Sequence, residues 1–178
     1  MVQILYTVTA IFVLGITVLT LNVRIHGTQQ RMMFSELAQE MTSVGAELLN
    51  EIGKAEYDPN TIFGEVLPRA ALSAEGTWGS GSCDPDNRFA SCFVINDFHG
   101  KTATRSITRT HDGAPVTVEY NVSDLEVHYV TESAPHTASA TQTYAKEVTL
   151  NISTPALVDA NGDPIEIPMS RVYTYPNF

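Results

Sequence analysis

The chain is poor in basic residues, and no charged side chain occurs between Met1 and Val23. Lys and Arg together number 10 of 178 residues against 20 Asp and Glu, so the net charge is −10. Nucleic-acid binding rests on clustered positive charge that neutralises phosphates. The largest local basic group holds Lys101, Arg105 and Arg109 on one face of a strand-like stretch, and we interpret it as a solvated strand edge or, second, as a contact with the acidic helix of another subunit. We therefore expect no nucleic acid as a partner.

Motifs for catalysis and metal binding are also missing from the sequence. None of the five histidines has HxH or HExxH spacing, and there is neither a GxSxG elbow nor a phosphate-binding glycine loop. The weak calcium candidates Asp159, Asn161 and Asp163 alternate as calcium ligands do, but they lack a distant bidentate glutamate, and ordinary turn chemistry explains them better. We expect no enzymatic activity, no cofactor and no metal.

Only two cysteines are present, Cys83 and Cys92, within a stretch rich in Gly, Ser, Asp, Pro and Asn. They are either two free thiols or a disulfide, and the composition of a flexible surface loop favours the disulfide. Zinc would need two further ligands at suitable spacing, which the sequence does not offer. A disulfide would place this part of the chain in an oxidising compartment outside the cytoplasm.

The uncharged opening is long enough to cross a membrane as a helix. At about 1.5 Å per residue, a helix over residues 1–23 would span about 34 Å, which exceeds the hydrocarbon core of a bilayer. It lacks the basic start and the small-residue cleavage site of a secretory signal peptide. We therefore expect a retained membrane segment, with the polar remainder outside the membrane.

A second, amphipathic helical pattern follows over residues 24–57 without a loop signal between the two. Its apolar stripe has spacings of three and four, and the acidic residues fall largely off it. We expect the stripe to pack on a sheet through Leu37, Met41, Val44, Leu48 and Ile52. Pro59 predicts the end of the helix near Tyr57. The two patterns together predict a helix of about 55 residues and about 80 Å, of which about half must find lipid or other subunits as partners.

The remainder reads as an irregular segment and then strands. Residues 58–100 carry many Gly, Ser, Asp and Pro, while alternating β-type runs occupy 101–109, 116–122, 125–131, 144–153 and 165–175. Ser123-Asp124 predicts a turn between two strands, residues 131–143 an exposed loop, and Asn161-Gly162 a hairpin.

The expected fold class is α+β, a long N-terminal helix with an apolar and an amphipathic half packed on an antiparallel sheet. The expected domains are 1–23 (transmembrane or filament-core helix), 24–57 (amphipathic helix), 58–100 (irregular loop with the disulfide) and 101–178 (antiparallel sheet head).

In this layout the chain resembles a type IV pilin or pseudopilin. Those subunits have an apolar half-helix, an amphipathic half-helix packed on an antiparallel sheet, and a variable loop between helix and sheet. The resemblance covers the whole chain as an architecture. Leu5 stands where the family usually has a glutamate, the family's proline late in the apolar half is absent, and the cysteines bracket a mid-chain loop.

The resemblance implies a structural subunit of an extracellular helical filament at the cell surface. The chain would polymerise with itself after residing in the inner membrane, with an assembly machinery and a leader peptidase as further partners. The residues expected to pack in the filament core are Leu5, Val8, Ile11, Phe12, Gly15, Val18 and Leu19. The alternatives are a minor pseudopilin of a secretion or DNA-uptake system and a membrane-anchored envelope protein that never polymerises.

Two further sites follow from a short motif. Asn121 and Asn151 match the glycosylation acceptor pattern.

Overall fold

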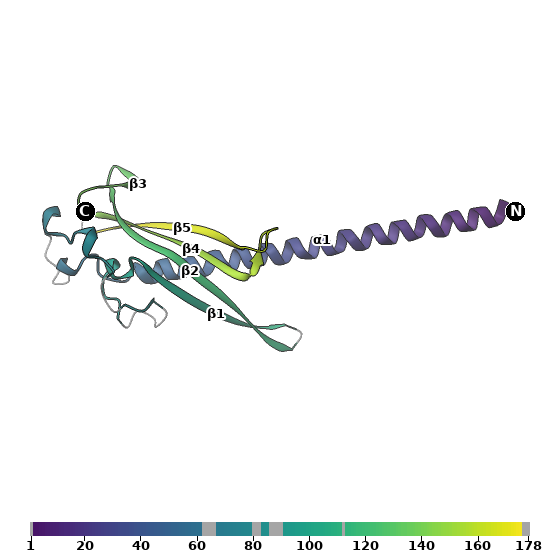
Figure 1. Ribbon diagram of the computed structural model, residues 1–178, viewed down its shortest axis with the longest axis horizontal. Coiled ribbons are helices and arrows are strands. Elements are labelled where there is room, and N and C mark those ends of the chain that lie inside the picture. Colours follow the sequence, from purple (N-terminus) through teal and green to yellow (C-terminus); the bar gives the residue numbers. More distant parts are fainter. Residues whose placement is uncertain (1, 62–66, 80–82, 86–90, 112, 176–178) are drawn as a thin grey trace. The chain divides into compact units, whose positions relative to one another are not determined.

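The computed structural model describes residues 2–61, 67–79, 83–85, 91–111 and 113–175 of the chain (Figure 1). For residues 2–10, 30 and 111 it describes the backbone without the side chain. The chain divides into two compact units, residues 1–39 and residues 40–178. We call the second unit the head.

One helix, α1, runs from Val2 to Ile52. It lacks proline, and its second half is rich in Leu, Met, Ala, Glu and Gln, which are strong helix formers. The predicted end near Tyr57 was wrong by five residues. After Ile52 the chain makes a turn, and Glu56 then pairs in parallel with Val94 through backbone hydrogen bonds. This bridge makes the chain extended before Pro59, so the helix ends earlier than the proline requires.

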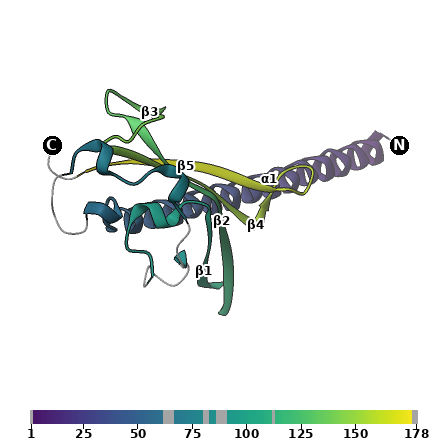
Figure 2. The same ribbon diagram turned by 60° about the vertical axis from the view of Figure 1, so that its left-hand side comes forward.

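The head contains an antiparallel sheet of five strands, which confirms the predicted α+β class (Figures 1 and 2). The strands are β1 (Lys101–His111), β2 (Ala114–Thr131), β3 (Ala134–Ala138), β4 (Ala145–Val158) and β5 (Pro164–Thr174). Their order is β1-β2-β4-β5, and β3 pairs with β2 outside that path. The hairpin predicted at Asn161-Gly162 is confirmed, since β4 and β5 pair on either side of it with Val158 opposite Pro164.

The turn predicted at Ser123-Asp124 is wrong, because β2 runs through it as one strand of 18 residues. The pairing of β2 with β4 shifts register between Ser123 and Glu126, and Asp124 has a φ of 50°. The buried positions are even-numbered at Tyr120 and Val122 and odd-numbered at Leu125, Val127 and Tyr129, and Val130 next to them is buried as well. An extra residue in one strand changes which face its side chains meet, so this irregularity is a bulge that keeps the apolar residues on one face.

The loop predicted over residues 131–143 contains a strand instead. β3 pairs with the end of β2, with Val130 opposite Ala138 and Thr131 opposite Ala134. All of its side chains are exposed. An edge strand with no buried face leaves no apolar alternation in the sequence, which explains why composition indicated a loop.

The core of the head lies between the last turns of α1 and one face of the sheet. A Cβ atom on Gly45 would lie 2.3 Å from Sδ of Met169 and 3.7 Å from Cδ1 of Leu150, so the helix backbone lies directly on β4 and β5. The hydroxyl of Tyr173 donates to the carbonyl oxygen of Leu49 at the end of the helix. A side chain at Gly45 would therefore have to displace the flexible end of Met169.

Candidate assembly helix and a buried polar cluster

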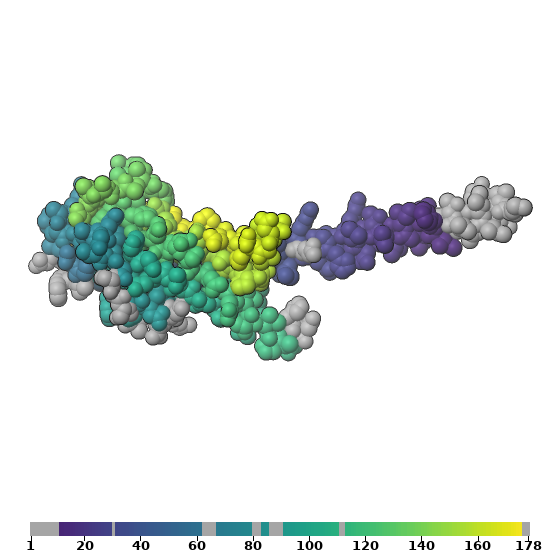
Figure 3. Space-filling view, viewed as in Figure 1, coloured from purple at the N-terminus to yellow at the C-terminus, as the bar shows by residue number. Residues whose placement is uncertain are grey.

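The N-terminal part of α1 exposes a nearly continuous set of large apolar side chains. Within the described residues these are Ile11, Phe12, Val13, Leu14, Ile16, Val18, Leu19, Leu21, Val23, Ile25, Met32, Met33 and Phe34. Figure 3 shows this part of the chain in purple to blue. By length and composition the helix is apolar enough to cross a membrane, with a mean hydropathy of 1.5 over its most apolar window and none of that window buried.

The residues expected in a filament core are mostly on this surface. Ile11, Phe12, Val18 and Leu19 are between 57% and 70% exposed. Gly15 has nothing within 4 Å of the position of a Cβ atom. Leu5 and Val8 are helical, but their side chains lie outside the described residues. The exposed positions are almost consecutive, so they surround the helix rather than form a stripe.

The stripe expected to pack on the sheet consists of buried residues. Leu37, Met41, Val44, Leu48 and Ile52 are all at most 6% exposed. The last four belong to the head, where the helix meets β4 and β5.

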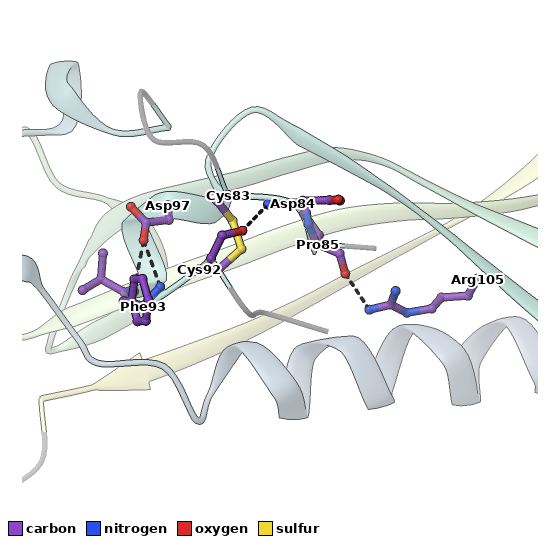
Figure 4. Close-up of a disulfide and its surroundings, with 9 residues drawn as sticks. Cys83, Asp84, Pro85, Cys92, Phe93, Asp97 and Arg105 are labelled. Carbon is purple, nitrogen blue, oxygen red and sulfur yellow. Dashed lines mark hydrogen bonds between the residues drawn. A yellow bond between two sulfur atoms is a disulfide. The ribbon is translucent and has the colours of Figure 1, made fainter. Parts of the chain in front are cut away.

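Cys83 and Cys92 lie at disulfide distance in the segment between α1 and the sheet, with Cα atoms 4.7 Å apart (Figure 4). Next to them, the backbone carbonyl of Pro85 accepts a hydrogen bond of 2.8 Å from Arg105 on β1. On the other side, the carboxylate of Asp97 accepts the backbone N–H groups of Phe93 at 3.1 Å and Val94 at 3.2 Å. The Pro85 contact therefore ties this segment to β1, whereas the Asp97 contacts stay within residues 93–97.

The basic face of β1 is not a purely solvated edge. Arg105 lies 3.4 Å from the carboxylate of Glu51, and Arg109 pairs with Glu40, both on α1 of the same chain. Glu40 also accepts a hydrogen bond from the hydroxyl of Tyr120. The acidic helix that this face contacts is thus its own, in the part of α1 that belongs to the head.

The remaining candidates lie on strands and turns. The glycosylation candidates Asn121 and Asn151 lie on β2 and β4. Asn121 is opposite Ser153 and Asn151 is opposite Ser123, so the two acceptor patterns lie beside each other on paired strands.

The calcium candidates form a turn. Asp159 Oδ1 accepts the backbone N–H groups of Asn161 at 2.8 Å and Asp163 at 3.0 Å, which is turn chemistry. Among the residues that the structure describes, no group of three or more His, Cys, Asp or Glu side chains could hold a metal ion.

The sequence reasoning missed the most unusual feature of the head, a buried ion pair. Lys146 on β4 and Asp58, just after α1, lie 3.0 Å apart, and both side chains are 0% exposed. The ammonium of Lys146 also donates to the carbonyl oxygen of Tyr57 at 2.7 Å and to Oδ1 of Asn96 at 2.7 Å. All three acceptors come from segments far from β4 in the sequence.

The carboxylate of Asp58 is saturated with donors. Besides Lys146, it accepts from the hydroxyl of Ser73 at 2.7 Å and from Nδ2 of Asn96 at 3.2 Å. Nδ2 of Asn96 also donates to Oγ of Ser73 at 2.6 Å, and Nε1 of Trp78 donates to the same oxygen at 2.9 Å. We call Asp58, Ser73, Asn96 and Lys146 the buried polar cluster.

Aromatic rings enclose the ammonium group. Nζ of Lys146 lies 4.2 Å from the ring centroid of Tyr57 and 5.0 Å from those of Trp78 and Tyr129. Rings in this position attract a cation, but they also exclude water.

Burial governs the ionisation of the cluster. Desolvation lowers the pKa of Lys146 to about 8, because it outweighs the attraction of Asp58. Burial alone would raise the pKa of Asp58, but Lys146 and the hydrogen bonds from Ser73 and the backbone of Asn60 hold it below its usual value. The pair therefore combines a stable carboxylate with an amine that releases its proton readily.

One signal in the sequence pointed to this site. Lys146 has the same parity as the buried residues Val148, Leu150 and Ile152 along β4, so strict alternation directs it into the core. A lysine in that position needs a buried partner, but the sequence does not say which of many acidic residues supplies it.

Comparison of the chain with known protein families, curated proteins and solved structures found no match.

Proposed function

We propose that the protein is the structural subunit of an extracellular helical filament, held together by the N-terminal part of α1 packed against the same segment of other copies. The observation that carries the proposal is the set of exposed apolar side chains on all sides of this helix. A helix that is apolar all round requires an apolar environment on every side. A single groove on one partner would cover only one face, whereas lipid or several neighbouring helices would cover all of them.

The polar groups of this segment are suited to such an environment. The hydroxyls of Thr17 and Thr20 donate to the carbonyl oxygens of Val13 and Ile16, each at 2.8 Å. Their donors are thus satisfied inside the helix, as an environment without water demands. The segment can therefore reside in a bilayer and later in a packed bundle without exposing an unpaired hydroxyl donor.

The energetic argument favours self-association outside the membrane. Each ~1,000 Å² of apolar surface removed from water contributes about 25 kcal/mol before the entropic costs of association. The head carries the net negative charge and would form the outer surface. A contact that repeats from copy to copy without closing generates a helical polymer rather than a ring.

The test is electron microscopy of material sheared from cells that express the full chain. Wild type should give filaments that contain this protein. Val13→Asp should abolish them, because a carboxylate would be buried without a partner. Val158→Asp is the matched control, since Val158 is a similarly exposed valine on the head, and filaments should persist.

Two results would overturn the proposal. Filaments formed by Val13→Asp would remove the helix from the core. Recovery of the wild type solely as a monomer in detergent-extracted membrane would indicate an anchor that does not polymerise. The fluorescence of Trp78, the single tryptophan, verifies that each variant has a folded head.

A further inference from the structure

We propose that Lys146 and Asn96 join through a covalent amide bond inside the head, formed without any other enzyme and with Asp58 as the catalytic residue. The three side chains come from β4, from the turn η5 (Ile95–Phe98) and from the segment after α1. The bond would therefore link the sheet covalently to the segment that precedes it. The chemistry lies within one chain and does not depend on filament assembly.

The geometry contains a nucleophile and an electrophile in contact. Nζ of Lys146 lies 2.7 Å from Oδ1 of Asn96, so the amine is already at the carbonyl group it would attack. Asn96 is 3% exposed and Lys146 is 0% exposed, so water does not compete. Holding two reacting groups in place raises their effective concentration to about 10⁵–10⁸ M in favourable cases. The reaction of an amine with an amide is slow in solution, and such an increase in effective concentration would accelerate it.

Asp58 is placed to move the protons. Its Oδ2 lies 3.0 Å from the attacking Nζ of Lys146 and 3.2 Å from Nδ2 of Asn96, which is the leaving nitrogen. One carboxylate oxygen thus contacts both the atom that must lose protons and the atom that must gain one. Ser73 accepts a hydrogen bond of 2.6 Å from the same Nδ2 and orients the amide as a positioning residue.

The reaction balances without an external reagent. Asp58 takes a proton from the ammonium of Lys146, and the neutral amine then attacks Cγ of Asn96 with its lone pair. Asp58 passes that proton to Nδ2, the bond between Cγ and Nδ2 breaks, and Nδ2 leaves as ammonia. Asp58 then takes the second proton from Nζ and transfers it to the ammonia, which departs as ammonium. The product is a secondary amide between the two side chains, and no electron acceptor or donor is needed.

The environment of Lys146 favours the neutral amine that this step needs. Besides Asp58, the titratable groups that act on it are Glu75, Tyr57 and Tyr129. Desolvation lowers the pKa of Lys146 to about 8 despite the attraction of the two carboxylates. In freshly refolded protein, linkage should accordingly proceed faster at pH 9 than at pH 6.

Mass spectrometry of the full chain, purified in detergent and reduced, tests the proposal. The wild type should be lighter than its sequence mass by one ammonia molecule. A tryptic digest should contain one branched peptide that joins the segments around Asn96 and Lys146. Lys146→Met, Asn96→Ala and Asp58→Ala should each restore the full mass, whereas Lys101→Met, the matched lysine control on β1, should still lose ammonia.

Several outcomes would overturn the proposal, and the wild-type digest decides most of them even if a variant fails to fold. A folded wild type with the full mass and two separate peptides excludes the bond. If the protein instead loses one water molecule and the branched peptide joins Lys146 to Asp58, the amide partner is Asp58 and the proposed bond to Asn96 is wrong. Loss of ammonia without a branched peptide indicates cyclisation at Asn161-Gly162 instead. A folded Asp58→Ala that still forms the branch removes Asp58 from the catalytic role.

Discussion

Asp58 and Lys146 form an ion pair 3.0 Å apart in which neither side chain reaches solvent, although 88 residues separate them in sequence. A buried pair adds little net stability, because removing two charges from water costs nearly as much as their attraction returns. Removal of one partner is more harmful, since it strands the other charge. The folded head is therefore stable only when β4 packs on the segment after α1 in the one arrangement that brings Lys146 and Asp58 together.

The cost of a stranded charge can be measured with two variants. Neither Asp58→Ala nor the double variant Asp58→Ala/Lys146→Met can form the proposed linkage, so their comparison isolates the lysine. We expect the double variant to be more stable by about 2 kcal/mol, because methionine fills the aromatic enclosure without a charge. Urea unfolding followed by the fluorescence of Trp78 measures the difference. Equal stability of the two variants would contradict the prediction.

The head should lose stability above pH 10. Burial is the main cause that raises the pKa of Tyr57, Tyr120, Tyr129 and Tyr173, in the last case to about 12. The unfolded chain releases these phenolic protons near pH 10. Between pH 10 and 12 the folded head therefore binds more protons than the unfolded chain, and its free energy of unfolding falls as the pH rises.

Two measurements check this pH dependence. Absorbance at the phenolate band should show these four tyrosines ionising together with unfolding. Tyr173→Phe should reduce the loss of stability between pH 10 and 12. A free energy of unfolding that is unchanged over that interval would contradict the assignment.

Gly79 should tolerate no side chain. Its φ is 69°, and a Cβ atom there would lie 2.2 Å from the carbonyl oxygen of His99, a backbone atom that cannot move aside alone. Gly79→Ala should destabilise the head by about 2 kcal/mol or more. Gly76→Ala is the matched control, because nothing lies within 4 Å of its Cβ position and its φ is ordinary. Thermal unfolding of both variants provides the comparison, and equal midpoints would contradict the prediction.

The features that the sequence predicted well are those set by local pattern. The uncharged opening and the stripe from Leu37 to Ile52 predicted one long helix, and Asn161-Gly162 predicted the last hairpin. Ser123-Asp124 misled, because polar residues that favour turns also occupy a bulge, and only the partner strand distinguishes the two.

The buried polar cluster was beyond prediction for a different reason. Alternation along β4 marks Lys146 as inward-facing, but its partners Asp58 and Asn96 lie in irregular segments without periodicity. Whether Asp58 and Asn96 come close to Lys146 depends on how the chain folds back against β4, which is a property of the tertiary structure. A local sequence pattern does not show which residues far apart in the chain become neighbours.

The helix between Ile11 and Leu21 has one more consequence. Its only polar side chains, Thr17 and Thr20, direct their donors to the helix's own backbone. Such a surface attracts any apolar neighbour but offers no directional bond by which one rotation or one axial position is preferred over another. In the filament that we propose, the order of the copies would be specified outside this segment, for example by the charged residues from Arg24 onward and by the heads.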